Sequence, residues 1–361
     1  MNLSWQAYLQ SHSAVIQDGC AVSYGNNAAE LESVRSATVL ADLSHFGLIH
    51  FSGEDAQSFL QGQLSCDIRE TNTAATDSTA LYGSYCNPKG RMLASFLVWP
   101  LMWHGDSGYV VQLPGGLRAA IQKRLSMFVL RAKVKLSDKS DALVRIGVAG
   151  GHADASVRKI LGTVPVSHLG VIHSQLGSVI RLAQDRFEFV IAPEHAPTVW
   201  ERLSEDAVPV GAACWDWLEI KAGIPVITAA TQEQFVPQMV NLDAIGGVSF
   251  HKGCYPGQEI VARTEYLGKI KRRMVLANIG PHASGAISPL PVPVTAGDEL
   301  FSTDMGEQSS GMIVNAAPAP EGGFDALAVV QTSSIEAGKI YWKSLDGPPL
   351  AIMPLPYPVN S

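Results

Sequence analysis

The segment from Lys252 to Glu259 contains residue types that suit both ligand binding and thiol chemistry. It holds a lysine, a cysteine, a proline and two glycines, and glycine lets backbone N–H groups approach a ligand closely. A cation and a helix N-terminus beside Cys254 favour the ionised, nucleophilic thiolate. The spacing therefore predicts a reactive Cys254 that Lys252 and nearby N–H groups activate. A plain turn around a buried cysteine is the alternative, because glycine and proline also mark ordinary turns.

Two further segments carry polar groups at expected turns. Gln61 and Gln63 flank a glycine at the predicted end of a helix, where their amides either contact a ligand or simply surround a glycine cap. Residues 87–91 form a turn with two cations, Lys89 and Arg91, which suit a carboxylate or a phosphate. A solvated turn has the same composition, so both interpretations stay open.

Two aromatic residues and a group of cations complete the candidates. Trp215 and Trp217 point in different directions on a helix, so at most one of them needs to lie in the core, and the other suits a heteroaromatic ligand. The densest run of positive charge follows the cysteine motif, and it suits a polyanionic tail, an RNA phosphate or a solvated face. Its members are Arg263, Lys269, Lys271, Arg272 and Arg273.

Composition limits the classes of protein that fit. The chain has 361 residues, 47% of them apolar, and a formal net charge of −7, which disfavours a protein built mainly to grip nucleic acid. The five cysteines are widely spaced and form no Cys-x-x-Cys pair, which favours a reducing compartment. No signal peptide or membrane span is recognisable, and no nucleotide-binding loop or zinc motif occurs. We therefore expect a cytoplasmic protein that does not bind membranes.

Hydrophobic periodicity predicts two successive units of strand, helix, hairpin and helix, which is typical of ferredoxin-like domains. The first unit is predicted from strands at residues 48–51, 81–86, 91–99, 109–113 and 131–136 and helices at 59–64 and 116–127. In this unit Ser52 is the expected helix N-cap. The second is predicted from strands at 143–148, 179–183 and 187–191 and helices at 152–161 and 196–203. Helices are also expected at 215–222 and 260–267.

The residue composition of the sequence changes after residue 274. Residues 281–297 are rich in proline, glycine and small side chains, and short strands are expected at 299–301, 311–314, 326–330 and 339–342. These short strands between turns predict a small β-barrel or sandwich. The proline-rich tail at 348–358 is expected to run extended over the surface.

Taken together, these motifs resemble the YgfZ family, the folate-binding relatives of the glycine cleavage T-protein. The family pattern Lys-Gly-Cys-Tyr-x-Gly-Gln-Glu is matched from Lys252 to Glu259. Residues 59–67 are similar to the family's Phe-Leu-Gln-Gly-Gln-Leu segment, and residues 87–91 to its Lys-Gly turn. Residues 235–250 resemble the run that leads into the motif, and the Pro-Leu-Pro-Tyr ending also fits. The similarity extends from about residue 40 over nearly all of the chain.

The resemblance implies an α+β fold with two ferredoxin-like domains and a C-terminal β-barrel, arranged as a T-protein-like three-domain cloverleaf. The expected division is a leader at 1–36, a first folate-binding domain at 37–138, a second domain with the motif at 139–274, and a barrel at 275–361. It also implies that tetrahydrofolate is bound, and that the protein assists iron–sulfur cluster assembly or repair and thereby tRNA methylthiolation. Iron–sulfur proteins or assembly factors are the expected partners, and direct nucleic-acid binding is not expected.

The resemblance implies roles for particular residues. Cys254 and Lys252 match the functional thiol and its lysine, and Phe46 and Trp215 match aromatic residues that flank the folate. The remaining expected folate contacts are Gln63, Lys89, Arg91, Glu219, Tyr255, Gln258 and Arg263.

Two positions depart from the relatives. The T-protein carries catalytic carboxylates after its Lys-Gly turn, whereas Ala94 and Ser95 stand there in this chain. This disfavours the alternative function, a tetrahydrofolate-dependent aminomethyltransferase. Lys221 occupies a position where relatives commonly carry a glutamate that accepts from pterin N–H groups, and a lysine offers no acceptor. Glu219 is a possible substitute.

Overall fold

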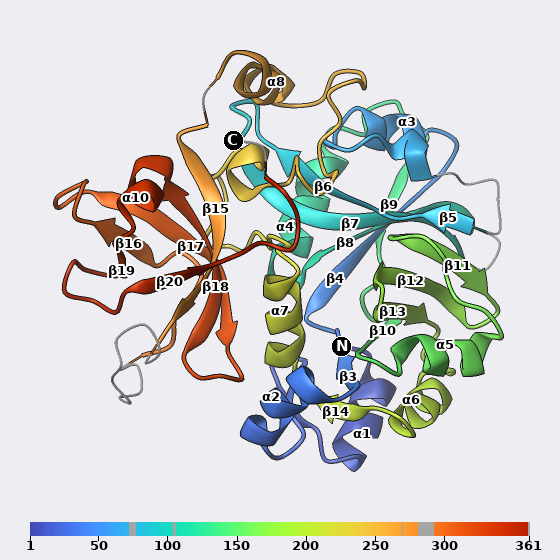
Figure 1. Cartoon of the computed structure of the whole chain (residues 1–361). Helices are drawn as coiled ribbons and strands as arrows, with labels where there is room; N and C mark the ends of the chain where they lie inside the picture. The colour runs from blue at the N-terminus through green and yellow to red at the C-terminus, as the bar shows by residue number, and fades with distance from the viewer. Residues whose placement is uncertain (72–76, 104–105, 269, 281–291, 360–361) are drawn as a thin grey trace. The chain divides into compact units, whose positions relative to one another are not determined.

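The computed structural model of the chain describes residues 1–71, 77–103, 106–268, 270–280 and 292–359. The chain divides into two compact units, and Figure 1 labels its helices and strands. The first unit comprises residues 1–61, 67–81 and 96–215, and the second comprises 62–66, 82–95 and 216–361. Each unit is therefore built from segments that are distant in sequence. The four-part division expected from the sequence stays a prediction.

A seven-stranded mixed sheet forms one layer of the first unit. Its strand order is β14-β3-β10-β13-β12-β11-β5, and all neighbours are antiparallel except β14 and β3. The strands are β3 (Val39–Asp42), β5 (Asp77–Thr79), β10 (Val144–Ala149), β11 (Gly170–Ser174), β12 (Gly177–Ala183), β13 (Arg186–Ile191) and β14 (Val208–Val210). The predicted hairpin is confirmed as β12 and β13. Helices α5 (Ala153–Leu161) and α6 (Ala196–Ser204) contact each other and supply apolar residues to the core.

The N-terminal residues are part of the core of this unit. They form α1 (Leu3–Ser11), the hairpin of β1 (Val15–Gln17) and β2 (Cys20–Ser23), and α2 (Asn27–Ser36). Trp5 is 1% exposed, packs in the same apolar cluster as Val144 and Trp200, and donates its indole N–H to Asp42 Oδ1 at 2.7 Å. Residues of α1 thus contribute buried side chains to the core of this unit.

A five-stranded sheet has the order β6-β7-β8-β4-β9. Its strands are β4 (Phe46–Ser52), β6 (Leu81–Cys86), β7 (Met92–Trp103), β8 (Asp106–Pro114) and β9 (Lys135–Asp138). Helix α4 (Gly115–Ser126) packs on β4 and β8, and α3 (Ala56–Gln61) contacts β8. The strand β7 starts in the second unit with residues 92–95 and continues into the first.

The predicted boundaries of one helix and one strand in this region are wrong. The helix expected at 59–64 spans Ala56–Gln61. Ser52 is the last residue of β4 and is therefore not the N-cap. Asp55 takes the position before the helix, and its carboxylate accepts from the backbone N–H of Lys133 at 2.8 Å. The strand expected at 131–136 begins at Lys135, because residues 129–134 form successive tight turns.

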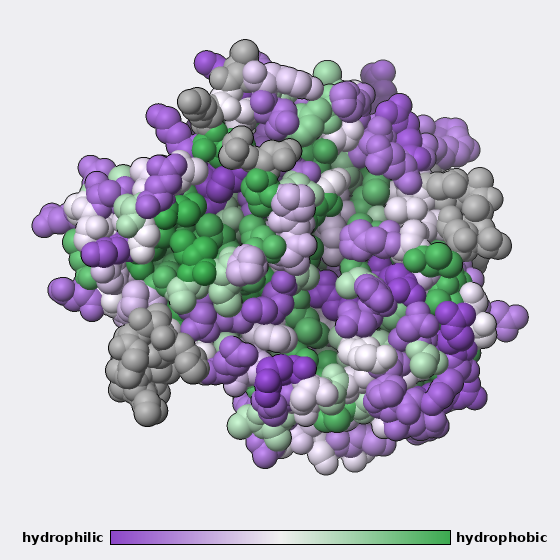
Figure 2. Space-filling view, in the orientation of Figure 1, coloured by the Kyte–Doolittle hydropathy of each residue, from purple (hydrophilic) through white to green (hydrophobic). Residues whose placement is uncertain are grey.

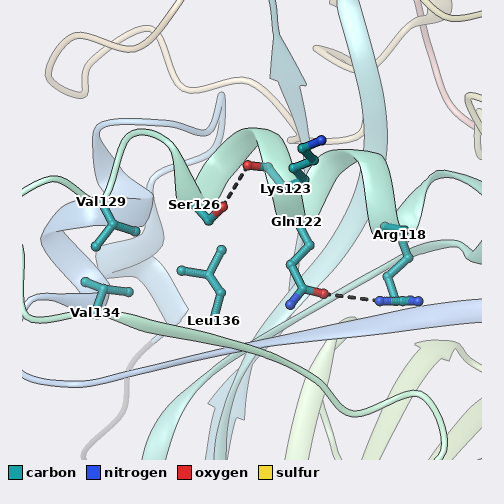
Figure 3. Close-up of a pocket in the computed structure, with 8 residues that line it drawn as sticks. Arg118, Gln122, Lys123, Ser126, Val129, Val134 and Leu136 are labelled. Carbon is teal, nitrogen blue, oxygen red and sulfur yellow. Dashed lines mark hydrogen bonds between the residues drawn. The ribbon is translucent and has the colours of Figure 1, made fainter.

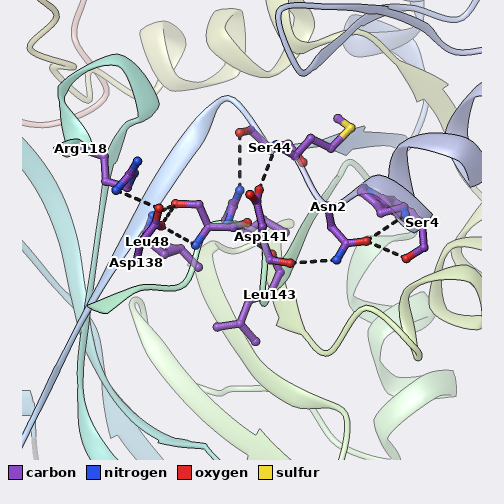
Figure 4. A network of polar contacts seen from close by, with 12 residues as sticks. Asn2, Ser4, Ser44, Leu48, Arg118, Asp138, Asp141 and Leu143 are labelled. Carbon is purple, nitrogen blue, oxygen red and sulfur yellow. Dashed lines mark hydrogen bonds and ion pairs between the residues drawn. The ribbon is translucent and has the colours of Figure 1, made fainter. Parts of the chain in front are cut away.

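The segment between β9 and β10 is held by many polar contacts (Figure 4). Asp138 accepts from Ser140 and pairs with Arg118 at 2.8 Å, while Ser140 Oγ accepts from the N–H of Leu48. Asn2 donates to the carbonyl of Asp141 at 2.9 Å. Residues 138–143 are thus held by hydrogen bonds and an ion pair within the first unit.

The second unit contains a six-stranded antiparallel sheet in the order β19-β16-β17-β18-β15-β20. The strands are β15 (Arg272–Ile279), β16 (Glu299–Ser302), β17 (Ser309–Pro318), β18 (Phe324–Gln331), β19 (Ile340–Trp342) and β20 (Leu350–Met353), with α10 (Thr332–Ala337) between β18 and β19. In Figure 2 hydrophobic residues gather over this sheet, whose edge strand β20 carries the exposed Ile352. The four predicted short strands are confirmed.

The proline-rich tail is more structured than the sequence predicts. Residues 350–353 pair with β15 as β20, and Tyr357 donates its hydroxyl to the carbonyl of Gly223 at 2.7 Å. Burial raises the pKa of Tyr357 to about 12. The residues 281–291 of the proline- and glycine-rich stretch lie outside the described part of the chain.

The anchoring of α1 leads to a stability prediction. We expect Trp5→Ala to lower the free energy of unfolding by about 3–5 kcal/mol, because it empties a packed site and removes the indole donor of Asp42. Leu3→Ala is the matched control on the same helix, since Leu3 is 81% exposed, and it should change stability by less than about 0.5 kcal/mol. Urea titrations of the two variants measure the free energies of unfolding. If Trp5→Ala changed stability as little as Leu3→Ala, the packing of Trp5 would not stabilise the fold.

Candidate functional site

Four segments singled out by the sequence come together in the second unit. They are residues 62–66, 87–91, 235–250 and 252–259. Ser65, fully buried, joins two of them: its hydroxyl donates to the carbonyl of Gly247 at 2.6 Å, and its own carbonyl accepts from the N–H of Ser249 at 2.9 Å. The same hydroxyl accepts from the N–H of Ser84 at 2.8 Å. The motifs are therefore parts of one folded assembly.

Lys252 of the cysteine motif is buried, with 6% exposure. Its ammonium donates to the carbonyl oxygens of Leu64 at 2.6 Å and Cys66 at 2.8 Å, and it lies 5.3 Å from the centre of the Tyr255 ring. The lysine thus clamps the Gln-Gly-Gln segment to the motif. This is a structural role, and activation of Cys254 by Lys252 stays a prediction.

Two glycines explain why the Lys-Gly turn and the cysteine loop meet. Gly257 has φ of 80°, and a Cβ on it would lie 2.4 Å from the carbonyl oxygen of Asn87 and 2.6 Å from Cα of Gly90. Gly90 has φ of 71°, so both backbones favour glycine. Asn87 shapes the turn, because its Oδ1 accepts from the N–H groups of Lys89 and Arg91.

Cys254 is exposed, as predicted, and its neighbour Tyr255 is buried. Burial, with smaller contributions from Cys86 and Cys66, raises the pKa of Tyr255 above its ordinary value. Helix α8 (Gln258–Leu267) begins four residues after the thiol, with Gly257 as its N-cap. The loop therefore holds a thiol at the surface above a buried aromatic ring.

The expected ligand contacts in this unit have different environments. Lys89 is exposed at the tip of its turn, whereas Arg91 donates to the carbonyl of Gln234. Gln63 is half-buried, and its Oε1 has no hydrogen-bond partner among the described residues. Gln258 is half-buried and Arg263 is exposed on α8.

The predicted group of cations does not act as one free surface. Arg273 donates to the carbonyl of Gln238 at 2.6 Å and pairs with Asp243 at 3.0 Å, with its side chain only 13% exposed. It holds the 237–243 segment, where η2 (Pro237–Val240) is followed by Asn241. Lys269 lies outside the described residues.

Helix α7 (Ala212–Lys221) crosses from the first unit into the second. In its second-unit part, Trp217 donates to Asp325 Oδ2 at 2.9 Å and Lys221 lies 3.4 Å from the same oxygen. Asp325 of β18 thus fixes Lys221, whose ammonium is 5.7 Å from the Trp217 ring. Glu219 is buried with 8% exposure.

Trp215, at the first-unit end of α7, is 1% exposed. Its benzo ring packs on Gly147 of β10, where a Cβ would lie 2.4 Å from the ring, and the Arg186 guanidinium lies 5.8 Å from its centre. The prediction that at most one of the two tryptophans lies in the core is confirmed, because Trp217 is half-buried.

A buried polar pair lies beside Trp215 and was not predicted. Glu188 of β13 is 1% exposed, stands opposite Gly147 in the sheet, and accepts from Gln112 Nε2 at 3.0 Å. Residues directly opposite each other project to the same face, so Glu188 shares a face with the Trp215 contact. A glutamate inside the apolar run from Phe187 to Ile191 was the signal that could have revealed it.

Phe46 lies on the face of the five-stranded sheet that carries Gln112. Gln112 is opposite Leu48, and Phe46 is two residues from Leu48, so the three side chains share one face. The opposite face packs on α4, since a Cβ on Gly47 would lie 2.9 Å from Arg118. The Gln112–Glu188 bond joins the two sheets, and the half-buried Phe46 and the buried Trp215 lie on the sheet faces that carry this pair.

Among the described residues, no three or more His, Cys, Asp or Glu side chains gather in a way that could hold a metal ion. No helix in that part of the chain is long and apolar enough to cross a membrane.

Comparison with known proteins identifies the class of fold to which this architecture belongs. Residues 20–249 match the family model of the GCVT N-terminal domain. The crystal structure of glycine cleavage system aminomethyltransferase T from Bartonella henselae is similar with a TM-score of 0.74 and 17% identity, over 99% of this chain and 97% of that one. The chain thus has the fold of the T-protein class, built from mixed α/β sheets.

Proteins named tRNA-modifying protein YgfZ are more similar in sequence. The protein from Colwellia psychrerythraea is 36% identical over 67% of this chain and 72% of its own length. Those from Klebsiella pneumoniae and Escherichia coli O157:H7 are 31% and 32% identical over 90% of this chain, and over 94% and 95% of their own. The chain therefore belongs to the YgfZ family, as the motif at 252–259 predicts.

The clamp formed by Lys252 is testable. We expect Lys252→Met to lower the free energy of unfolding by about 2–4 kcal/mol, because two buried carbonyls lose a charged donor. Lys89→Met, at an exposed turn, is the matched control and should change stability by less than about 0.5 kcal/mol. A Lys252 variant as stable as the control in urea would contradict the structural role.

Proposed function

We propose that this chain is a folate-binding protein that assists iron–sulfur cluster assembly or repair and thereby supports tRNA modification. The proposal rests on membership of the YgfZ family, whose named relatives are tRNA-modifying proteins. The single observation that carries the folate part is the interior region of the first unit, where two aromatic residues border a buried carboxylate–amide pair. For the finer architecture we propose two ferredoxin-like domains and a C-terminal barrel in a three-domain cloverleaf.

Tetrahydrofolate needs an apolar slot and hydrogen-bond acceptors, because its pterin ring is flat and carries N–H donors. Phe46 is a half-buried wall and Trp215 a buried base of the proposed slot. The Glu188 carboxylate supplies the acceptor that Lys221 lacks, and Gln112 orients it through the bond at 3.0 Å. In this arrangement the pterin does not depend on the Lys221 position, which is held by Asp325.

The motif unit would supply the remaining contacts. Lys89 and Arg263 are exposed cations that suit the carboxylates of a glutamate tail, and Gln63 and Gln258 are half-buried amides. Glu219, Tyr255 and Arg91 are the other proposed folate contacts. We assign Cys254 as the functional thiol, supported by its exposure at the end of a glycine-bounded loop.

Transfer of an aminomethyl group is the disfavoured alternative. Where the T-protein has carboxylates, this chain has Ala94 and Ser95. Ser95 is buried, and its hydroxyl accepts from the N–H of Ile227 at 2.9 Å. That position therefore supports the backbone and offers no general base. We propose a cytoplasmic protein with a folate ligand and iron–sulfur proteins or assembly factors as partners.

The role of Glu188 in folate binding can be measured by calorimetry. We expect wild-type protein to bind tetrahydrofolate at a single site and Glu188→Gln to weaken binding by about tenfold or more, because a charged acceptor is lost while the shape is kept. Glu201→Gln, on the exposed side of α6, is the control and should bind normally. Absence of binding heat with wild-type protein at millimolar tetrahydrofolate would contradict the folate proposal. If Glu188→Gln and wild-type protein bound with equal affinity, the pterin would not contact Glu188.

The thiol is tested separately in cells that lack the protein. We expect Cys254→Ala to fold normally, since Cys254 is exposed, yet to restore the activity of an iron–sulfur tRNA methylthiolase poorly. Cys20→Ala is the control thiol substitution. Full restoration by Cys254→Ala would remove the thiol from the function. Formation of methylene-tetrahydrofolate from an aminomethyl donor would instead favour the transferase alternative.

A further inference from the structure

A second concentration of positive charge lies in residues 115–139, away from the proposed folate site. Residues 115–139 contain seven lysines and arginines and a single carboxylate, Asp138, in a chain whose net charge is −7. Arg118 pairs with Asp138 at 2.8 Å and Lys133 with Glu54 at 2.7 Å. Lys123, Arg131 and Lys135 are exposed. Neither the folate site nor the cysteine motif uses this surface.

This charge borders a groove of about 580 Å³ between α4 and β9 (Figure 3). One wall is the polar side of α4 and the other is apolar. The lining residues are Arg118, Ala119, Gln122, Lys123, Ser126, Val129, Val134 and Leu136. In Figure 3, Val134 and Leu136 point from the strand side toward the helix. The groove is thus amphipathic, with an apolar floor and a cationic rim.

The sheet topology explains why this space is open. α4 packs on β4 and β8, while β9 pairs with β4 and is the last strand of its sheet. Leu136 stands opposite Phe51, which lies on the α4 face, so the sheet extends one strand beyond the helix. An edge strand presents unpaired backbone N–H and C=O groups on its outer side, where a strand of another chain can pair. Lysine side chains on the edge strand commonly hinder this pairing. Lys135, the first residue of β9, fits that protection, and an acidic strand would neutralise its charge.

The loop after α4 adds exposed apolar side chains at one end of the groove. Met127, Phe128 and Leu130 are 61%, 46% and 88% exposed, and Leu130 has a left-handed φ of 46°. Three large apolar residues exposed within four positions exceed the scattered exposure that is normal for a surface. They flank Val129, which lines the groove, in the sequence.

We propose that the groove between α4 and β9 is a docking site for an extended acidic peptide segment of a partner protein. Such a segment would add beside β9, place alternate apolar side chains on Val129, Val134 and Leu136, and present carboxylates to the rim lysines. The apolar floor favours a peptide over a nucleic-acid backbone, which requires cations rather than aliphatic contacts. The pairing of Arg118 with Asp138 also removes one cation from a phosphate surface. This proposal is independent of folate binding.

The proposal is tested by fluorescence polarisation with the full-length protein and a fluorescein-labelled peptide of alternating glutamate and leucine. We expect saturable binding that weakens with salt. The double variant Lys123→Glu with Lys135→Glu should weaken it by about tenfold or more, since both exposed side chains reverse charge. Arg202→Glu with Lys339→Glu is the control, because it makes the same charge change at exposed sites elsewhere.

Two further measurements decide the mode and the class of partner. Hydrogen exchange of residues 134–138 should slow when the peptide binds, whereas unchanged exchange would contradict strand addition at β9. Absence of peptide binding at millimolar concentration would overturn the proposal. It would also be overturned if unfractionated tRNA bound, and the Lys123/Lys135 variant alone lost that binding, while the peptide did not compete.

Discussion

The ammonium of Lys252 is the contact on which the candidate site of the second unit depends. It binds the carbonyls of Leu64 and Cys66, so a segment from early in the chain is held beneath a loop almost two hundred residues later. Burying a charge is costly unless several acceptors surround it, and here two carbonyls and an aromatic face do so. The exposed position of Cys254 follows, because Lys252 and Tyr255 on either side of it point inward.

The turn at residues 87–91 also packs closely against the loop at residues 252–259. Gly257 lies so close to the turn that a Cβ on it would meet the Asn87 carbonyl, Gly90 has a positive φ, and Asn87 closes the turn with its own side chain. The residues that make the motif recognisable are thus explained mainly by packing between segments. Cys254 of the motif is exposed, and its chemical role stays a proposal.

The sequence allowed the local elements of the fold to be predicted, and the reasons are physical. The hairpin of β12 and β13 was found because alternation and the turn at 184–186 are local signals. The buried position of Trp5 was not predicted, because it depends on contacts with Val144 and Trp200 that no local pattern reports. β9 starts late because turns at 129–134 override an alternating pattern. For the site, the motif was visible as a run of residue types, whereas the Glu188–Gln112 pair arises from two sheets meeting and has no sequence spacing.

The central claim is that tetrahydrofolate binds in the first unit between Phe46 and Trp215. A crystal structure of the protein with tetrahydrofolate tests this most directly. The account predicts pterin density between these two side chains, with the ring N–H groups facing the Glu188 carboxylate. Pterin density beside Lys221 and Asp325, or an unliganded interior at saturating tetrahydrofolate, would contradict it.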